Sequence, residues 1–328
     1  MGGQRLHSRR FGESLQTPNQ ALQQTAGHDS LFVTAAHRCP TAAELGRYAG
    51  RASEGRQVNP GTDDLIRSNE AAWDRAAAKY ALAVDGDIAF LRDGGVSLQE
   101  SERSILPDLH GYGRAIHLQC SYGLDALSLL NLGVSEVVGV DISRAMLSLA
   151  EKMSVALHAR ALWVHAPVLD TPTFLNATAD LVYTGKGALP WVDDLGRWAS
   201  VSARLLRPGG YFFLYEGHPL NWVWDSAAHS HTLSRDGRGY FDRRPRANET
   251  FPASAVSRYT PPGEAVPVAW EHQWTLGDVV TALCQAGLQI ERMAEYPQHF
   301  WPQFPDVQEE EMWRLPHSFS VLAAARAA

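Results

Sequence analysis

The sequence predicts an α/β fold with a doubly wound, mostly parallel sheet. Short apolar runs at residues 115–118, 136–140 and 161–165 alternate with stretches of helical pattern, as in parallel sheets with helical crossovers. A polar turn follows the first run at residues 117–123, where such sheets bind ligands. The chain has 328 residues, of which 45% are hydrophobic, so it is long enough to bury one large core.

The first 63 residues differ in composition from the rest. They are rich in Gln, Ser, Arg, Gly and Ala and show no sustained hydrophobic period, so we predict a disordered extension at residues 1–63 and one folded domain at 64–328. Helix formers follow the capping residue Ser68, which predicts a helix from there to about Val84. A second helical stretch at 101–106 ends before Pro107.

The central part of the chain alternates strands and helices. Gly133 and the turn at 208–210 supply two of the stops between them. The predicted elements are a strand at 115–118, a helix at 124–132, a strand at 136–140, a helix at 143–158, strands at 161–165 and 180–184, a helix at 194–206 and a strand at 211–216.

Residues 217–275 interrupt this rhythm. They carry many Pro, Trp, His and Arg residues with little periodicity, which predicts a cap inserted into the domain, with short antiparallel strands. Regular structure returns with a helix at 276–286 that stops at Gly287, followed by strands at 288–294 and 318–325. The predicted cap therefore lies before the last helix and the last two strands.

The turn at 117–123 and the acid Asp141 form the predicted cofactor site. Asp141 ends the second strand, 18 residues after Gly123, close to the spacing of about 20 residues expected for an acid that binds ribose hydroxyls. The turn has one glycine where a dinucleotide fingerprint has three, which disfavours a pyrophosphate and favours S-adenosylmethionine, a cofactor without phosphate. An ordinary strand–helix turn with Asp141 as a helix cap is the alternative.

The segment HLQCSYGLDALSLLNLGVSEVVGVDIS closely resembles the first motif and second-strand acid of a bacterial subgroup of class I S-adenosylmethionine-dependent methyltransferases with an HLQCxxGxD motif. LVYTGKGALPWVDDLGRWASVSARLLRPGG, YEGHPL and WTLGDVVTALCQAGLQIERMAEYP resemble later segments of that family in the same order. The resemblance covers roughly Asn69 to the C-terminus. It implies a Rossmann-like sheet of seven strands, the last of them antiparallel, and S-adenosylmethionine as cofactor.

The resemblance also implies which residues bind the cofactor. The methionine end would contact the turn, the ribose and adenine would contact the ends of the second and third strands, and the methyl donor would lie over the fourth strand. These positions are His117, Gln119, Cys120, Ser121, Gly123, Asp141, Ile142, Pro167, Val168, Thr184 and Gly185.

Two departures from the general family pattern stand out. His117, Gln119 and Ser121 replace an acid and two glycines, a change shared by the subgroup, and Pro167 stands where an acid or amide is commoner. Asp170 is a candidate for the missing polar contact to adenine.

Methyl transfer from a sulfonium needs a positioned nucleophile, and it needs a base only where the acceptor must lose a proton. His218 and Tyr183 are the first candidates for that base. Further candidates in or beside the cap are Glu216, His229, His231, Tyr240 and His272, each of which is also explained by a structural role. Aromatic residues of the cap suit an apolar or planar acceptor, or else a small satellite core: Trp222, Trp224, Tyr240, Phe241, Trp270 and Trp274.

Composition limits the partners. The net charge of -7 disfavours nucleic acid, so a small-molecule acceptor is expected. Cys39, Cys120 and Cys284 are widely spaced, which suggests neither a metal site nor a disulfide framework. No long apolar run or secretory signal is present, and we expect a cytoplasmic protein without membrane contact; the oligomeric state stays open. The rival functions are a non-catalytic binding protein on the same fold and a nucleotide-dependent oxidoreductase.

Overall fold

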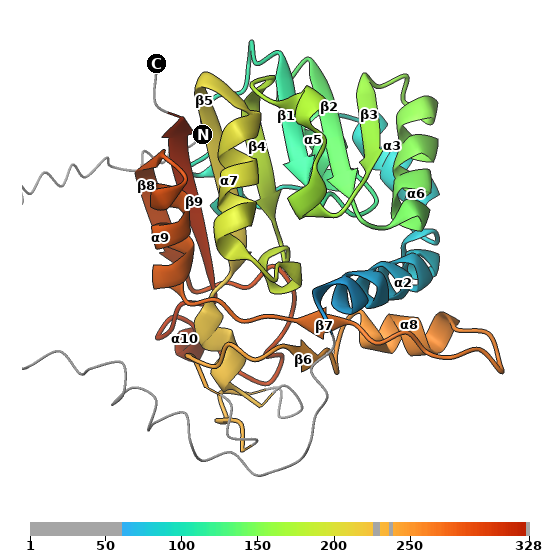
Figure 1. Ribbon diagram of the computed structural model, residues 1–328, viewed down its shortest axis with the longest axis vertical. Coiled ribbons are helices and arrows are strands. Elements are labelled where there is room, and N and C mark those ends of the chain that lie inside the picture. Colours follow the sequence, from blue (N-terminus) through green and yellow to red (C-terminus); the bar gives the residue numbers. More distant parts are fainter. Residues whose placement is uncertain (1–60, 226–229, 236–238, 326–328) are drawn as a thin grey trace, which may run out of the picture. The chain divides into compact units, whose positions relative to one another are not determined.

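A seven-stranded sheet forms the centre of the computed structural model, which describes residues 61–225, 230–235 and 239–325. The strand order is β3-β2-β1-β4-β5-β9-β8 (Figure 1). The strands are β1 (Arg114–Leu118), β2 (Glu136–Asp141), β3 (Ala161–His165), β4 (Ala179–Gly185), β5 (Leu206–Gly217), β8 (Leu288–Tyr296) and β9 (Ser318–Ala325).

Only β9 runs against the other strands of this sheet. The first five strands pair in parallel, whereas β9 pairs antiparallel with both β5 and β8. This confirms the predicted doubly wound, mostly parallel sheet with its antiparallel last strand. Because the parallel strands all end at one side, their carboxyl ends form a single edge, which we call the cofactor edge.

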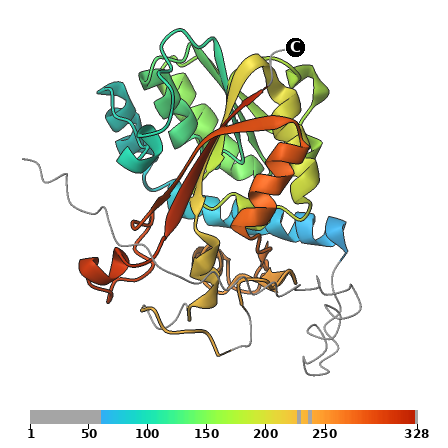
Figure 2. The same cartoon turned by 90° about the vertical axis from the view of Figure 1, so that its left-hand side faces the viewer.

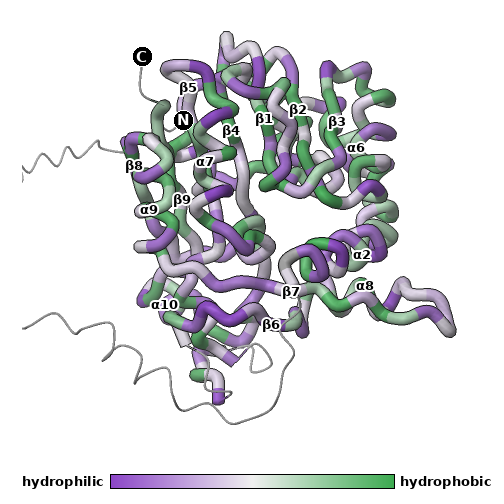
Figure 3. Tube along the Cα trace, viewed as in Figure 1, coloured by the Kyte–Doolittle hydropathy of each residue, from purple (hydrophilic) through white to green (hydrophobic). Residues whose placement is uncertain are grey.

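Helices cover both faces of the sheet, so the central strands are buried on both sides. On β4, Leu181 and Tyr183 pack with the helices on one face, while Val182 belongs to the core on the other face. Figure 3 accordingly shows the central strands as largely hydrophobic. The covering helices are α3 (Val84–Arg92), α5 (Leu124–Asn131) and α6 (Arg144–Ala156) on the first face, and α7 (Leu195–Leu205) and α9 (Leu276–Gln285) on the second.

The remaining elements gather near the cofactor edge. Helix α2 (Thr62–Tyr80) lies across this edge and packs against α6 and α8 (Figures 1 and 2). In the predicted cap, β6 and β7 form an antiparallel pair, as expected. The short elements are α4 (Glu100–Arg103), η1 (Val168–Asp170), η2 (Thr173–Leu175), η3 (Leu189–Trp191), η4 (Pro219–Val223), β6 (Arg246–Ala247), α8 (Ala253–Tyr259), β7 (Trp270–Glu271) and α10 (Glu309–Met312).

One boundary and one helix differ from the prediction. Helix α2 begins at Thr62 after the cap position Gly61, six residues before Ser68, and Ser68 instead donates a hydrogen bond to the carbonyl of Val268, 2.5 Å away. Helix α3 was not predicted, because Gly86 and two aspartates weaken its helical pattern, and it forms by burying three apolar side chains. Disorder was predicted for residues 1–63: residues 1–60 lie outside the described residues, whereas Thr62 and Asp63 belong to the first turn of α2.

Candidate cofactor and acceptor site

The turn between β1 and α5 has the backbone strain expected of a binding loop. Gln119 and Ser121 have φ values of 58° and 51°, and Gly123 has a φ of 85°. A Cβ atom at Gly123 would lie 2.6 Å from the Trp163 ring and 2.8 Å from Ala150. Glycine is therefore required here by both conformation and space.

Asp141 lies beside this turn and is only 8% exposed. Its carboxylate accepts hydrogen bonds from the backbone N–H of Ser121, at 2.7 Å, and of Ser143, at 2.8 Å. Burial raises the pKa of Asp141 to about 6, with Asp74 adding to the rise, against the lowering effect of these two bonds. Each carboxylate oxygen keeps acceptor capacity for a ligand hydroxyl.

Buried polar atoms without a partner lie among the predicted cofactor residues. They are His117 Nδ1, Gln119 Oε1 and Thr184 Oγ1. A buried polar atom without a partner is costly, and a bound ligand is one explanation for it. With the Asp141 acceptors, this donor and acceptor set fits a cofactor with an amino-acid end and ribose hydroxyls.

Two of the predicted cofactor residues are too deeply buried for direct contact with a cofactor. His117 is 3% exposed, packs edge-on against Tyr183 with ring centroids 4.7 Å apart, and has its pKa lowered to about 4 by burial. Cys120 is 2% exposed, and burial raises the pKa of its thiol. They support the turn from within the core.

At the predicted adenine side, Ile142, Pro167 and Val168 are half-buried at the ends of β2 and β3. His165 Nε2 lies 2.8 Å from the Ile142 carbonyl and 3.1 Å from Glu70 of α2. Asp170, the other adenine candidate, instead pairs with Arg197 at 2.7 Å.

Helix α2 is attached directly to the ribose side of the site. Its Asp74 accepts hydrogen bonds from Ser143 Oγ, at 2.6 Å, and from the backbone N–H of Ala145, at 2.9 Å, at the start of α6. Trp73 meets the ring of Trp191 at 5.3 Å, and Tyr80 meets Tyr122 of the turn at 4.7 Å. The helix therefore covers the cofactor edge as a lid.

The loop after β4 is held by the end of β5. Gly185 lies so close to β5 that an added Cβ would be 2.1 Å from the Tyr215 carbonyl oxygen. The buried Glu216 carboxylate accepts from the backbone N–H groups of Gly187, Ala188, Leu189 and Gly217, at 2.7–3.0 Å. Glu216 is thus a structural acceptor, and the Thr184 to Leu189 loop is fixed by it.

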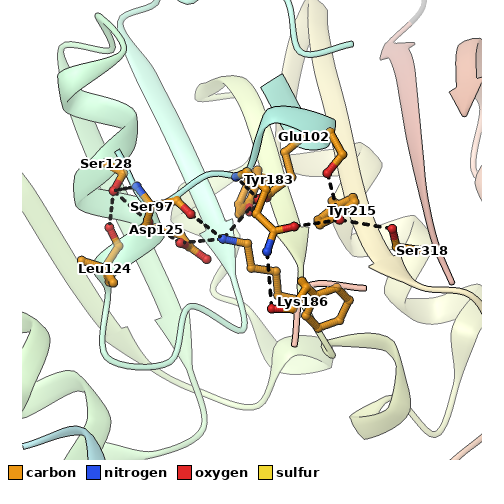
Figure 4. A network of polar contacts seen from close by, with 12 residues as sticks. Ser97, Glu102, Leu124, Asp125, Ser128, Tyr183, Lys186, Tyr215 and Ser318 are labelled. Carbon is orange, nitrogen blue, oxygen red and sulfur yellow. Dashed lines mark hydrogen bonds and ion pairs between the residues drawn. The ribbon is translucent and has the colours of Figure 1, made fainter. Parts of the chain in front are cut away.

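Lys186 of this loop is half-buried and lies between two carboxylates (Figure 4). Its Nζ lies 3.2 Å from Glu102 of α4 and 3.0 Å from Asp125 of α5. Burial opposes the charge, but the two carboxylates raise the pKa of Lys186; burial raises the pKa of Glu102. The network continues from Tyr183, whose hydroxyl donates to Glu102 at 2.5 Å.

This geometry argues against Tyr183 and His218 as bases. Tyr183 is fully buried with its hydroxyl bound to Glu102, and burial raises its pKa well above 10. His218 caps η4: its Nδ1 accepts from the N–H of Leu220 at 3.1 Å, and its Nε2 lies 3.0 Å from Glu295. Both ring nitrogens are therefore occupied.

The other cap candidates are dispersed. His231 stacks on His317 at 5.0 Å, and Tyr240 accepts from the N–H of Leu276 through its hydroxyl. Phe241 is 79% exposed, so the cap aromatics do not form one wall. His229 lies outside the described residues.

Three groups were missed by sequence reasoning. Asp74, the Glu102–Asp125 pair around Lys186, and Glu271 of β7 carried no motif, and only the fold brings each to its partners. For Glu271 the available signal was an acid between Trp270 and His272 in an aromatic segment.

Two hollows on the surface of the described residues are lined by side chains other than the predicted cofactor residues. One hollow of about 640 Å³ lies at the opposite edge of the sheet near Arg114, Arg160 and Arg207, and another of about 500 Å³ lies at the start of α7 beside Trp274. Neither is lined by a predicted cofactor residue. Within the described ranges, no helix is long and apolar enough to cross a membrane, and no cluster of three metal-ligating side chains occurs.

The sequence and the fold of this chain are similar to those of known proteins. Residues 116–214 match the family model Methyltransf_11, described as a methyltransferase domain. This segment is therefore similar to a methyltransferase domain. It contains the turn, Asp141, β4 and most of β5, and the match supports S-adenosylmethionine as the cofactor.

Solved structures share the fold of this chain. A structure from Listeria monocytogenes, whose description assigns it as an S-adenosylmethionine-dependent methyltransferase, is 18% identical and has a TM-score of 0.51; the alignment covers 68% of this chain and 95% of that one. An S-adenosylmethionine-dependent methyltransferase from Mesorhizobium loti is 23% identical with a TM-score of 0.50, covering 68% and 94%. The search of curated proteins found no match.

Proposed function

We propose that this chain transfers the methyl group of S-adenosylmethionine to a small-molecule acceptor. The observation that carries the proposal is the meeting of the strained turn, the buried Asp141 carboxylate and the unpartnered Gln119 Oε1 and Thr184 Oγ1 at the edge where β1, β2 and β4 end. We also propose that the chain belongs to the HLQCxxGxD subgroup. The matched family model describes methyltransferase domains in general and does not distinguish this subgroup.

Each group has a role in this proposal. Asp141 accepts hydrogen bonds from the ribose hydroxyls, and the turn at Gln119 to Gly123 holds the amino-acid end. Thr184 and Gly185 lie under the methyl group, which the cofactor supplies in an electrophilic form on a sulfonium. Trp73 and Tyr80 of the lid exclude water, so that the reaction depends on proximity and a dry site.

A small molecule is the favoured acceptor because the chain has a net charge of -7 and α2 covers the cofactor edge with the aromatic side chains of Trp73 and Tyr80. A macromolecular acceptor would need an open and complementary surface.

Calorimetric titration of S-adenosylmethionine, S-adenosylhomocysteine and NAD tests the cofactor. The two adenosyl sulfur compounds should bind and NAD should not. Asp141→Asn should weaken their binding by about tenfold or more, because a hydrogen-bonded charge is lost. Asp85→Asn, in an exposed ion pair with Lys152, is the matched control and should bind normally.

Three other outcomes would contradict the proposal. Binding of NAD alone would favour the oxidoreductase. Binding of none of the three compounds would favour the non-catalytic interaction protein. Cofactor binding without transfer to any acceptor in a broad chemical screen would also favour a binding role.

A further inference from the structure

The β6–β7 pair of the cap contains a buried carboxylate that the proposed function does not use. Arg246 and Glu271 are cross-strand partners, and Arg246 Nε lies 3.7 Å from Glu271 Oε2. The Glu271 side chain is 12% exposed and that of Arg246 is 27% exposed. Burial of a carboxylate in so small an element is costly, and the distance from Arg246 to Glu271 is longer than a charge-assisted hydrogen bond.

Backbone contacts place Glu271 between two walls of the cofactor edge. On one side, the backbone N and O of Trp270 bond to the Asn69 side chain of α2, at 2.6 and 3.0 Å. On the other side, the N–H of His272 donates to the Pro190 carbonyl of η3, at 2.7 Å. Figure 1 shows β7 beside α2 at the carboxyl ends of the strands.

A third wall comes from the segment after β5. The Arg246 guanidinium lies 3.6 Å from the centre of the Trp222 ring in η4, within cation–π distance. The residues on either side of Glu271 therefore bond to α2 and η3, and its partner Arg246 contacts the segment after β5. These elements lie around the cofactor edge, and in the proposed reaction the acceptor would bind among them.

The surroundings raise the proton affinity of the Glu271 carboxylate. Burial raises the pKa of Glu271 to about 7, against lowering by Arg246 and by a hydrogen bond from Asn248. Arg246 is the charged group that acts on it; α2 and η4 contribute the neutral Asn69 and Trp222. On β7 itself, burial lowers the pKa of the neighbouring His272, which also disfavours charge.

On the basis of the proposed methyl transfer, we propose that Glu271 is the general base that takes the proton of a phenol-type hydroxyl acceptor. The acceptor oxygen forms a bond to the methyl carbon, the carbon–sulfur bond breaks, and its electron pair stays on sulfur. The hydroxyl proton moves to Glu271. Arg246, held against Trp222, keeps the carboxylate in place and stabilises its charged form before the transfer.

Proton affinity supports this acceptor class. A phenol hydroxyl has a pKa near 10, whereas an ordinary Glu has one of about 4.3. The raised pKa of Glu271 narrows this gap, which improves general base catalysis near neutral pH. The aromatic side chains nearby also suit a planar acceptor.

Infrared difference titration of the full chain tests the base without an acceptor. The wild type should show a carboxyl group that titrates near pH 7, and this signal should vanish in Glu271→Gln and persist in Glu249→Gln, an exposed carboxylate of the cap. Arg246→Met should move the titration to higher pH, which provides a second readout if Glu271→Gln folds poorly. An unchanged signal in both variants would overturn the proposal.

Transfer of labelled methyl groups from S-adenosylmethionine to phenol, 4-methylphenol and catechol tests the reaction. Glu271→Gln should lower kcat about a hundredfold or more, change KM little and remove the limb of the pH profile near 7. Equal rates in wild type and Glu271→Gln would overturn the base. Cofactor binding with no methylated phenol would overturn the hydroxyl acceptor.

Calorimetry separates this proposal from the proposed function. Glu271→Gln should bind S-adenosylmethionine within about twofold of wild type, because Glu271 lies on the acceptor side. If the wild type itself fails to bind S-adenosylmethionine, the proposed function fails, and the role of Glu271 as base in methyl transfer fails with it. If the wild type binds the cofactor and the infrared signal does not depend on Glu271, only the present proposal fails.

Discussion

Gly185 ends β4 at a point where β4 and β5 approach each other closely. Its φ is 159°, and the Tyr215 carbonyl oxygen occupies the place of a side chain. The same oxygen accepts from the N–H of Lys186 at 2.7 Å, so the two strands cannot separate without losing this bond. Because Gly185 has no side chain, β4 and β5 can approach this closely, and the loop after β4 can reach Glu216.

Substitution of this glycine should destabilise the protein strongly. Gly185→Ala should lower the free energy of unfolding by at least about 2 kcal/mol, because backbone must move to admit the methyl group. Gly86→Ala, in α3 with no atom within 4 Å of the new Cβ, should instead raise it by about 0.5–1 kcal/mol. Urea unfolding measures both, and an equal effect of the two changes would contradict the packing argument.

The pKa of Asp141 has a consequence for cofactor affinity. Ribose hydroxyls donate to the carboxylate, so binding favours the deprotonated form, and the proton must leave before the cofactor binds fully. Because the pKa is raised to about 6, affinity should be full above about pH 7 and fall about tenfold per unit below about pH 6. Calorimetry from about pH 5 to 8 should show this slope in wild type, whereas Asp141→Asn should bind weakly with little slope.

At the scale of elements, the attachment of α2 depends on one carboxylate. Asp74→Ala removes the acceptor for Ser143 Oγ and for the N–H of Ala145. It should destabilise the attachment of α2 to α6 by about 1–2 kcal/mol. Hydrogen exchange should become faster in residues 62–80 and stay unchanged in α7. Asp64→Ala, which removes an exposed pair with Arg67, is the control and should leave exchange in the rest of α2 unchanged. Unchanged exchange in Asp74→Ala would show that the aromatic contacts alone hold the lid.

Most elements were predictable from sequence because their signals are local. The strands β1, β2 and β3 are short apolar runs between clear stops, and Ser143, Asp194 and Thr275 cap α6, α7 and α9 through their own side chains. Helix α3 was missed because tertiary burial overrides its weak propensity. The start of α2 was misplaced because no side-chain cap marks it.

The site was predictable only where it depends on one loop and the strand before it. The turn and Asp141 follow from strand ends and spacing. The roles of Tyr183, His218 and Glu216 depend mainly on partners 27 to 81 residues away in sequence, and no local pattern reports such partners. Lys186 lies in no motif, and only the fold places it between Glu102 and Asp125.

At the scale of the whole molecule, stability should differ between the sheet centre and the cap. Strands β1 and β4 are covered on both faces and paired on both sides, whereas β6 and β7 are two residues long. Native-state hydrogen exchange should therefore be slowest in β1 and β4, with exchange only through global unfolding, and much faster in β3 and the cap. Uniform protection across the cap and the sheet would contradict this expectation.

The lid joins parts of the chain that are far apart in sequence. Asn69 of α2 bonds to the backbone of Trp270, 201 residues later, and Arg75 pairs with Glu264. During synthesis on the ribosome, the turn, Asp141 and the first five strands all emerge before residue 270 exists. The nascent chain can therefore build the cofactor edge early, but α2 gains its partner in β7 only after Trp270 has been made.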